Sequence, residues 1–317
     1  MVIINKKNTS VYFAVFLSII FHSLGFTSFL LVLPLLTYYY RSRESKNTLL
    51  ALVGLLVFIL VVEIFPILGN LSDKGIVGML SIGLFLPIAL IGSSIVWVLL
   101  DGYRLLVRYV AGSAIIAVLM VIIGFWFKSD VSMAVAVDNT IFNLVNSLLS
   151  QNGQQSQLVL GAATQELLPI LRVVVLSMLF PLGATCFGLN VFYALSTPKF
   201  FGDEEFDERV KNWKLPESFM WTFLASLILL LLNIVVDFTL IISLIVLNLV
   251  MFLALLFAVQ GLSIILYRLR AKGKQIKAGK LFGLTLFLII LFQGLNIVAV
   301  FGLPIIGVTE TWFTYRK

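Results

Sequence analysis

The sequence predicts an all-α integral membrane protein, a polytopic transmembrane helix bundle with eight or nine membrane segments. Hydrophobic residues make up 61% of the chain and charged residues only 12%, whereas a soluble globular protein contains about 25% charged residues. Residues 219–267 also contain a single charge, at Asp237. This charge separates two apolar runs. Because about 20 apolar residues cross a bilayer as a helix, the runs predict two adjacent membrane-spanning helices.

The first apolar stretch, residues 11–40, contains no Asp, Glu, Lys or Arg. A single crossing would place Lys6 and Lys7 on the opposite side of the membrane from Arg41, against the positive-inside tendency. We therefore prefer two short segments, divided near residues 22–25, with both flanks in the cytoplasm. Thirty residues are few for two full crossings, so one segment can be re-entrant if its backbone is buried in protein.

The remaining apolar runs continue the same pattern along the chain. With the two short segments included, the predicted membrane segments are residues 11–21, 26–40, 48–67, 75–100, 107–127, 167–195, 219–236, 238–267 and 281–301. Pro87 and Pro181 fall inside two of them, where each removes a helix hydrogen bond and favours a kink. We treat residues 1–317 as one integral membrane domain.

The basic residues predict the orientation of these spans. Six Lys or Arg side chains lie between residues 268 and 280, and such a cluster marks a cytoplasmic loop. Counting spans from there places residues 197–215 on the same side, together with most of the basic residues. The same count places the carboxy-terminal tail outside, where Arg316 and Lys317 break the rule.

Two loops have recognisable content. Residues 128–165 carry apolar side chains at helical spacing opposite asparagines, which predicts an external amphipathic helix on the membrane surface or over the bundle. The cytoplasmic loop of residues 197–215 contains acids and bases four residues apart, such as Asp207 and Lys211. Pairs at this spacing predict a short solvated helix.

Composition and motifs limit the chemistry. One cysteine, Cys186, excludes an internal disulfide and a multi-cysteine metal site, and one histidine, His22, excludes a histidine cluster. There is no GxxxxGKS/T nucleotide-binding loop, HExxH motif or GxSxG motif. The acids Glu63, Asp101 and Glu310 fall near predicted span ends, and Asp237 is placed more favourably at the outer surface than inside the bilayer. We predict no enzymatic activity and no cofactor. We attribute the net charge of +7 to basic residues in cytoplasmic loops. We therefore expect no nucleic acid as partner.

Uncharged polar residues within the predicted spans are the candidates for ligand binding. They are Asn190, Asn248, Gln260, Gln293 and Asn296. Gln293 and Asn296 are three residues apart and share a helix face. Each of these amides serves equally well to form a hydrogen bond between helices, and such a bond contributes about 1 to 2 kcal/mol or less.

Three parts of the chain resemble the YybS-like family of bacterial multi-pass membrane proteins, a group without an assigned function. They are Pro34 at the end of the first stretch, the entry at residues 206–216 with Trp213-Lys214-Leu215-Pro216, and the ending from Gly307 through Glu310 to Arg316. The resemblance covers nearly the whole chain. The family is also distantly similar to the substrate-capturing subunits of energy-coupling-factor transporters. That likeness implies Ala14 and Ser18, a small-xxx-small pair on the first helix, as contacts with a coupling subunit.

These inferences lead to two hypotheses. The first is a bacterial inner-membrane protein that binds a small ligand or partner within its bundle as a transporter subunit. It would depend on a coupling ATPase from another chain. The alternative is a non-transporting envelope scaffold or assembly partner. In both cases the lipid bilayer is the main solvent of the side chains.

Overall fold

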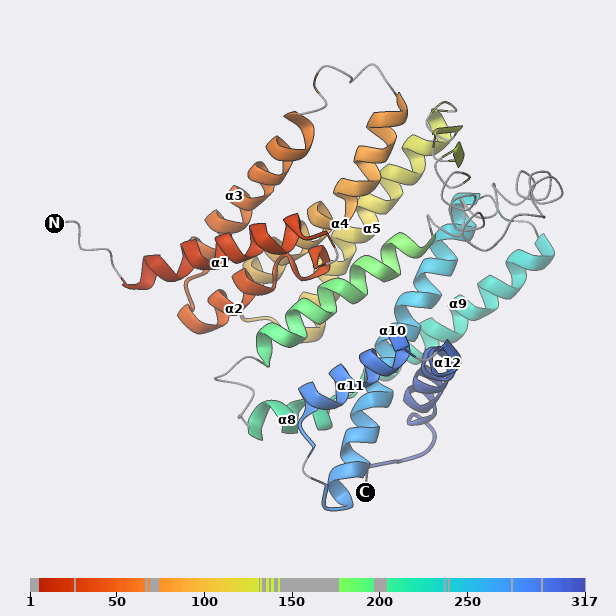
Figure 1. Ribbon diagram of the computed structural model, residues 1–317. Coiled ribbons are helices and arrows are strands. Elements are labelled where there is room, and N and C mark those ends of the chain that lie inside the picture. The colour runs from red at the N-terminus through yellow and green to blue at the C-terminus, as the bar shows by residue number, and fades with distance from the viewer. Residues whose placement is uncertain are drawn as a thin grey trace, which may run out of the picture. The chain divides into compact units, whose positions relative to one another are not determined.

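The chain forms two compact units, Met1–Asn190 and Val191–Lys317, in the computed structural model shown in Figure 1. The structure describes residues 6–25, 27–65, 68, 74–130, 132, 135–136, 138–139, 142, 177–196, 204–236, 238, 240–274, 276–291 and 293–316. The boundary between the units falls inside the Ser177–Leu195 helix, the unlabelled green ribbon in Figure 1. That residues 1–317 form a single integral membrane domain stays a prediction.

Every regular element among these residues is a helix. Unit 1 contains α1 (Lys6–Ser23), η1 (Ser28–Leu30), α2 (Leu33–Ser42), α3 (Ser45–Ile64), α4 (Lys74–Leu99), α5 (Leu105–Ser129) and most of the Ser177–Leu195 helix. Unit 2 contains α8 (Glu204–Lys211), α9 (Glu217–Val236), α10 (Leu240–Ala271), α11 (Ala278–Leu291) and α12 (Gln293–Thr309). The predicted all-α class is confirmed for the part of the chain that the structure describes.

Five of the described helices are long and apolar enough to cross a membrane. They are Ser45–Ile64, Leu80–Leu99, Leu105–Trp126, Ser177–Leu195 and Ile242–Ala271. Four shorter apolar helices accompany them: Val11–Ser23, Glu217–Asn233, Ala278–Leu288 and Ala299–Thr309. The chain is therefore a multi-pass membrane protein, and the count of eight or nine crossings stays a prediction that depends on the shorter helices. Residues 128–165 and Asp237 lie largely or wholly outside the described residues.

The first apolar stretch is broken, as its flanking charges predicted. After α1 the chain turns through η1 into α2, which has 10 residues and is therefore about 15 Å long, half of a hydrocarbon layer. The buried side chains of this short helix are Leu35, Leu36, Tyr38, Tyr39 and Tyr40. This burial fits a re-entrant segment, because the irregular backbone where such a segment turns cannot face lipid.

Unit 2 is organised around α10, which contacts α8, α9, α11 and α12. Asn233 at the end of α9 accepts hydrogen bonds from the backbone N–H of Phe238 and from Ser243, which closes the hairpin to α10. The closest helix contact lies between α10 and α12. A Cβ added at Gly261 would overlap the carbonyl of Leu303, and one added at Gly307 would overlap the carbonyl of Phe257.

The predicted single span at residues 281–301 is replaced by two helices, α11 of 14 residues and α12 of 17 residues. Ala278 begins α11 and Thr309 ends α12, so the helical region is longer at both ends than the apolar run suggested. Helix α12 extends past the apolar run because its residues up to Gly307 pack against α10.

Gly307→Ala tests this close crossing. The new methyl group would meet a backbone carbonyl that cannot rotate away, so we expect a loss of roughly 1 to 3 kcal/mol of stability, as for other overpacked sites. The measurement is thermal unfolding of the detergent-purified chain. Gly54→Ala is the matched control, because nothing lies within 4 Å of a Cβ at that helical position. An equal effect of both substitutions would contradict the tight crossing.

Candidate functional site

Gln260 lies at the centre of a polar cluster in unit 2. Its side chain is buried on α10, and its Oε1 accepts a hydrogen bond of 3.0 Å from the backbone N–H of Leu215. Its Nε2 donates to the carbonyl of Gly307 at 3.1 Å and to Oε2 of Glu310 at 2.8 Å. One amide therefore joins α10, the segment that leads into α9, and the end of α12.

Glu310 and Arg316 form the charged part of this cluster. Glu310 is 6% exposed, and Arg316 approaches it with Nε at 2.8 Å from Oε1 and Nη2 at 3.1 Å from Oε2. The contact is an ion pair with one hydrogen bond, from Nη2 to Oε2. Arg316 also donates to the carbonyls of Lys211 at 2.8 Å and Trp213 at 2.9 Å. The carboxy-terminal tail is thus fastened to the segment before α9.

This contact overturns the predicted position of the tail. The tail was expected on the opposite side from residues 197–215, but Arg316 bonds directly to two carbonyls of that segment. The expectation counted residues 281–301 as one crossing, whereas the structure describes two helices, α11 and α12, over that region. The two regions that carried the family resemblance, residues 206–216 and residues 307–316, meet at this cluster.

Asp207 on α8 connects two further segments of unit 2. Its carboxylate accepts hydrogen bonds from Nη2 of Arg270 and from the backbone N–H of Ala278, the first residue of α11. The predicted pair with Lys211 is wrong, because Lys211 bonds Glu208 instead at 2.6 Å. Lys211 is engaged with Glu208, and Asp207 pairs with Arg270 from α10. The Lys211 ammonium, which hydrogen-bonds the Glu208 carboxylate, holds the pKa of that group below its ordinary value.

We name the surface formed by residues 204–216, 268–280 and 310–316 the polar platform of unit 2. Its segments are far apart in the sequence but are joined by the Gln260, Glu310 and Asp207 contacts. The platform can hold a fixed arrangement of surface charges. The charged groups at its core are already paired with one another.

Unit 1 contains a comparable cluster around Arg108, a residue that the sequence analysis did not single out. Arg108 is 4% exposed, and its Nε and Nη2 donate to the carbonyl of Trp97 at 3.0 and 2.7 Å. The guanidinium lies 4.3 Å from the centre of the Trp97 ring and 3.3 Å from Asp101. Trp97 in turn donates to the Tyr40 hydroxyl at 2.8 Å. A signal was available, because Arg108 lies inside the apolar run at 107–127.

The predicted ligand-binding amides do not form one described set. Asn190 belongs to unit 1 and donates to the carbonyl of Phe29 at 2.6 Å. Among the described residues, Asn248 donates to Leu244 of its own helix. It lies 12 residues before Gln260 on α10, a separation of about 18 Å. The side chains of Gln293 and Asn296 are outside the described part of the structure. Only Gln260 enters a cluster that joins several segments.

The predicted partner contacts, Ala14 and Ser18, are buried within unit 1. A coupling subunit could reach this face only if neighbouring helices of the chain moved, and the contact stays a prediction. Glu63, one of the acids near a predicted span end, is paired with His22, whose Nε2 lies 3.1 Å from Oε1 of Glu63. This pair joins the ends of α1 and α3.

Asn190→Leu tests the role of Asn190 in the broken first stretch. The carbonyl of Phe29 would lose its amide donor, and we expect a loss of about 1 to 3 kcal/mol, as for other unsatisfied buried groups. Thermal unfolding of the purified chain measures this loss of stability. Asn248→Leu is the matched control, because its described amide bond stays within one helix. If both variants unfolded at the same temperature, the bridge to Phe29 would carry no stability.

A double-mutant cycle tests the Glu310–Arg316 pair. Glu310→Gln or Arg316→Gln leaves one buried charge without its partner, so each should cost roughly 3 to 5 kcal/mol. The double variant should cost less than the sum of the two single losses, which thermal unfolding will measure. Strict additivity would show that the two residues act independently.

Comparisons with known proteins agree with the membrane character of this fold. A family model described as "Predicted membrane protein (DUF2232)" matches residues 10–306. No curated protein and no solved structure matches the chain. Because the family model covers most of the sequence, the chain belongs to the DUF2232 family of predicted membrane proteins.

Proposed function

We propose that this protein is a non-enzymatic subunit of an assembly in the bacterial inner membrane. Its polar platform faces the cytoplasm and docks a partner protein. The Arg316 contacts carry this proposal. They fasten the last residues of the chain to residues 211–213 and to the buried Glu310.

An ordered tail has a cost, because each fixed residue loses roughly 1 to 2 kcal/mol of backbone entropy. A solvated tail at the end of a membrane protein needs no such order. A surface that is already ordered loses less entropy when a partner binds. The fastened tail therefore supports a docking role for the platform.

The charge of the platform indicates the chemistry of the partner. Its exposed basic residues include Lys214, Arg268, Lys272, Lys274 and Lys280. Asp207 and Glu310 are both engaged with arginines. A partner with an acidic surface fits this excess of positive charge.

In the first form of the proposal the assembly is a transporter and the partner is a coupling ATPase. The chain lacks a nucleotide-binding loop, so ATP hydrolysis would come from the partner. The similarity of the YybS-like family to energy-coupling-factor subunits supports this form, in which Asn190, Asn248, Gln260, Gln293 and Asn296 remain the candidate ligand contacts. Ala14 and Ser18 remain its candidate contacts with a coupling subunit.

In the second form the protein is an envelope scaffold without transport. The described amides support this form. Asn190 and Gln260 bond backbone atoms of other segments, as structural glue does. Each of these hydrogen bonds joins segments within its own unit.

The test begins with the tagged full chain, isolated with its partner from native membranes and then recombined with that purified partner. We expect Lys272→Glu, Lys274→Glu and Lys280→Glu together to weaken binding by roughly tenfold or more, since like charges would then face each other. Arg104→Glu, an exposed change in unit 1, is the control and should bind normally.

The nature of the partner separates the two forms. A transporter subunit should bind an ATPase and retain a small molecule in a fixed ratio, whereas a scaffold should bind a protein without ATPase activity. Equal binding of the charge-reversed and control variants would show that the platform is not the docking surface.

A further inference from the structure

The turn between α2 and α3 presents three basic side chains. Arg41, Arg43 and Lys46 are all exposed. None of the three has an ion-pair partner among the residues that the structure describes. This cluster belongs to unit 1.

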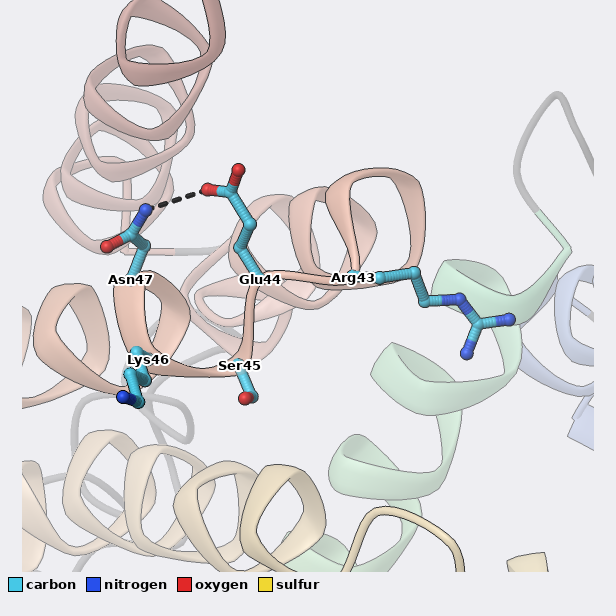
Figure 2. Close-up of a pocket in the computed structure, with 5 residues that line it drawn as sticks. All are labelled: Arg43, Glu44, Ser45, Lys46 and Asn47. Carbon is cyan, nitrogen blue, oxygen red and sulfur yellow. Dashed lines mark hydrogen bonds between the residues drawn. The ribbon is translucent and has the colours of Figure 1, made fainter.

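The one acid of the turn is turned away from these cations. Figure 2 shows the Glu44 carboxylate on the same side as Asn47, while Ser45 and Lys46 point to the opposite side and Arg43 extends outward. Glu44 accepts hydrogen bonds of 2.7 Å from both Asn47 Nδ2 and the Tyr38 hydroxyl. The carboxylate is thus engaged with Tyr38 and Asn47.

Arg43 adopts an unusual backbone conformation. It ends α2 with φ 58° and ψ 22°, in the left-handed region, and its N–H bonds the carbonyl of Tyr39 at 2.9 Å. Glycine is the usual residue at this position because it has no Cβ. An arginine there carries a conformational cost, which is consistent with a role for its side chain.

The turn lies where α3 starts to face lipid. From its second turn onward, α3 exposes Leu50, Val53, Val57 and Val61 at helical spacing. Apolar side chains on such a face contact acyl chains. The residues just before this face therefore lie at the level of the lipid headgroups.

A pocket of about 360 Å³ opens at this level and is lined by Arg43, Glu44, Ser45, Lys46 and Asn47 (Figure 2). Its exposed charges are positive, and the lipid-facing surface of α3 continues from it. We propose that this turn binds the headgroup phosphate of an anionic phospholipid, whose acyl chains lie along α3. The chemistry is a phosphodiester held by Arg43 and Lys46, the two cations that line the pocket.

Arg43→Gly gives a sharp test, because it removes the cation and also relieves the left-handed backbone. The probe is phosphatidylglycerol added to the purified full chain in a neutral detergent, and the readout is the rise in unfolding temperature on binding. Arg41→Gln, Arg43→Gly and Lys46→Gln together should weaken apparent lipid binding by roughly tenfold or more. Without lipid, this variant should unfold at or above the wild-type temperature.

The control removes three charges elsewhere, with Lys272→Gln, Lys274→Gln and Lys280→Gln. It should keep the wild-type response to phosphatidylglycerol. An equal loss in the control would show general charge attraction, and no loss in the turn variant would show that the turn does not bind lipid. Equal stabilisation by phosphatidylcholine or by inorganic phosphate would also overturn the proposal.

Discussion

The structure depends on one constraint, that backbone polar groups within a bilayer must find partners inside the protein. Polar side chains meet it at several of the described helix breaks and ends. Asn190 bonds the carbonyl of Phe29 beside the broken first stretch, and Arg108 bonds that of Trp97 near the end of α4. In unit 2, Arg316 bonds the carbonyls of Lys211 and Trp213, and Gln260 bonds the N–H of Leu215. These buried polar residues act first as partners for backbone.

Much of the fold was predictable because apolar runs and flanking charges are local signals. The break in residues 11–40 followed from Lys6, Lys7 and Arg41, and the α9–α10 hairpin followed from the single charge at Asp237. The division of residues 278–309 into two helices was missed. The close packing of Gly307 against Phe257, 50 residues earlier, was missed as well, because no local pattern reports such a contact.

The candidate site was predictable only in part. Gln260 was identified as a polar residue in an apolar span, but its partners come from segments 45 and 50 residues away. Glu310 and Arg316 carried the family resemblance without indicating what they bind. Asp207 shows the same limit, because its i,i+4 lysine was the only partner visible locally and Arg270 lies 63 residues away.

The tail contact also makes the charge distribution consistent. Arg316 donates to the carbonyls of Lys211 and Trp213, so it lies on the side of unit 2 where the segment before α9 lies. At 14 and 17 residues, α11 and α12 are about 21 and 26 Å long, each shorter than a 30 Å hydrocarbon layer. Neither helix needs to be counted as a full crossing. Arg316 lies beside the basic residues of 197–215, the segment that the positive-inside rule assigns to the cytoplasm, so the tail is no exception to that rule.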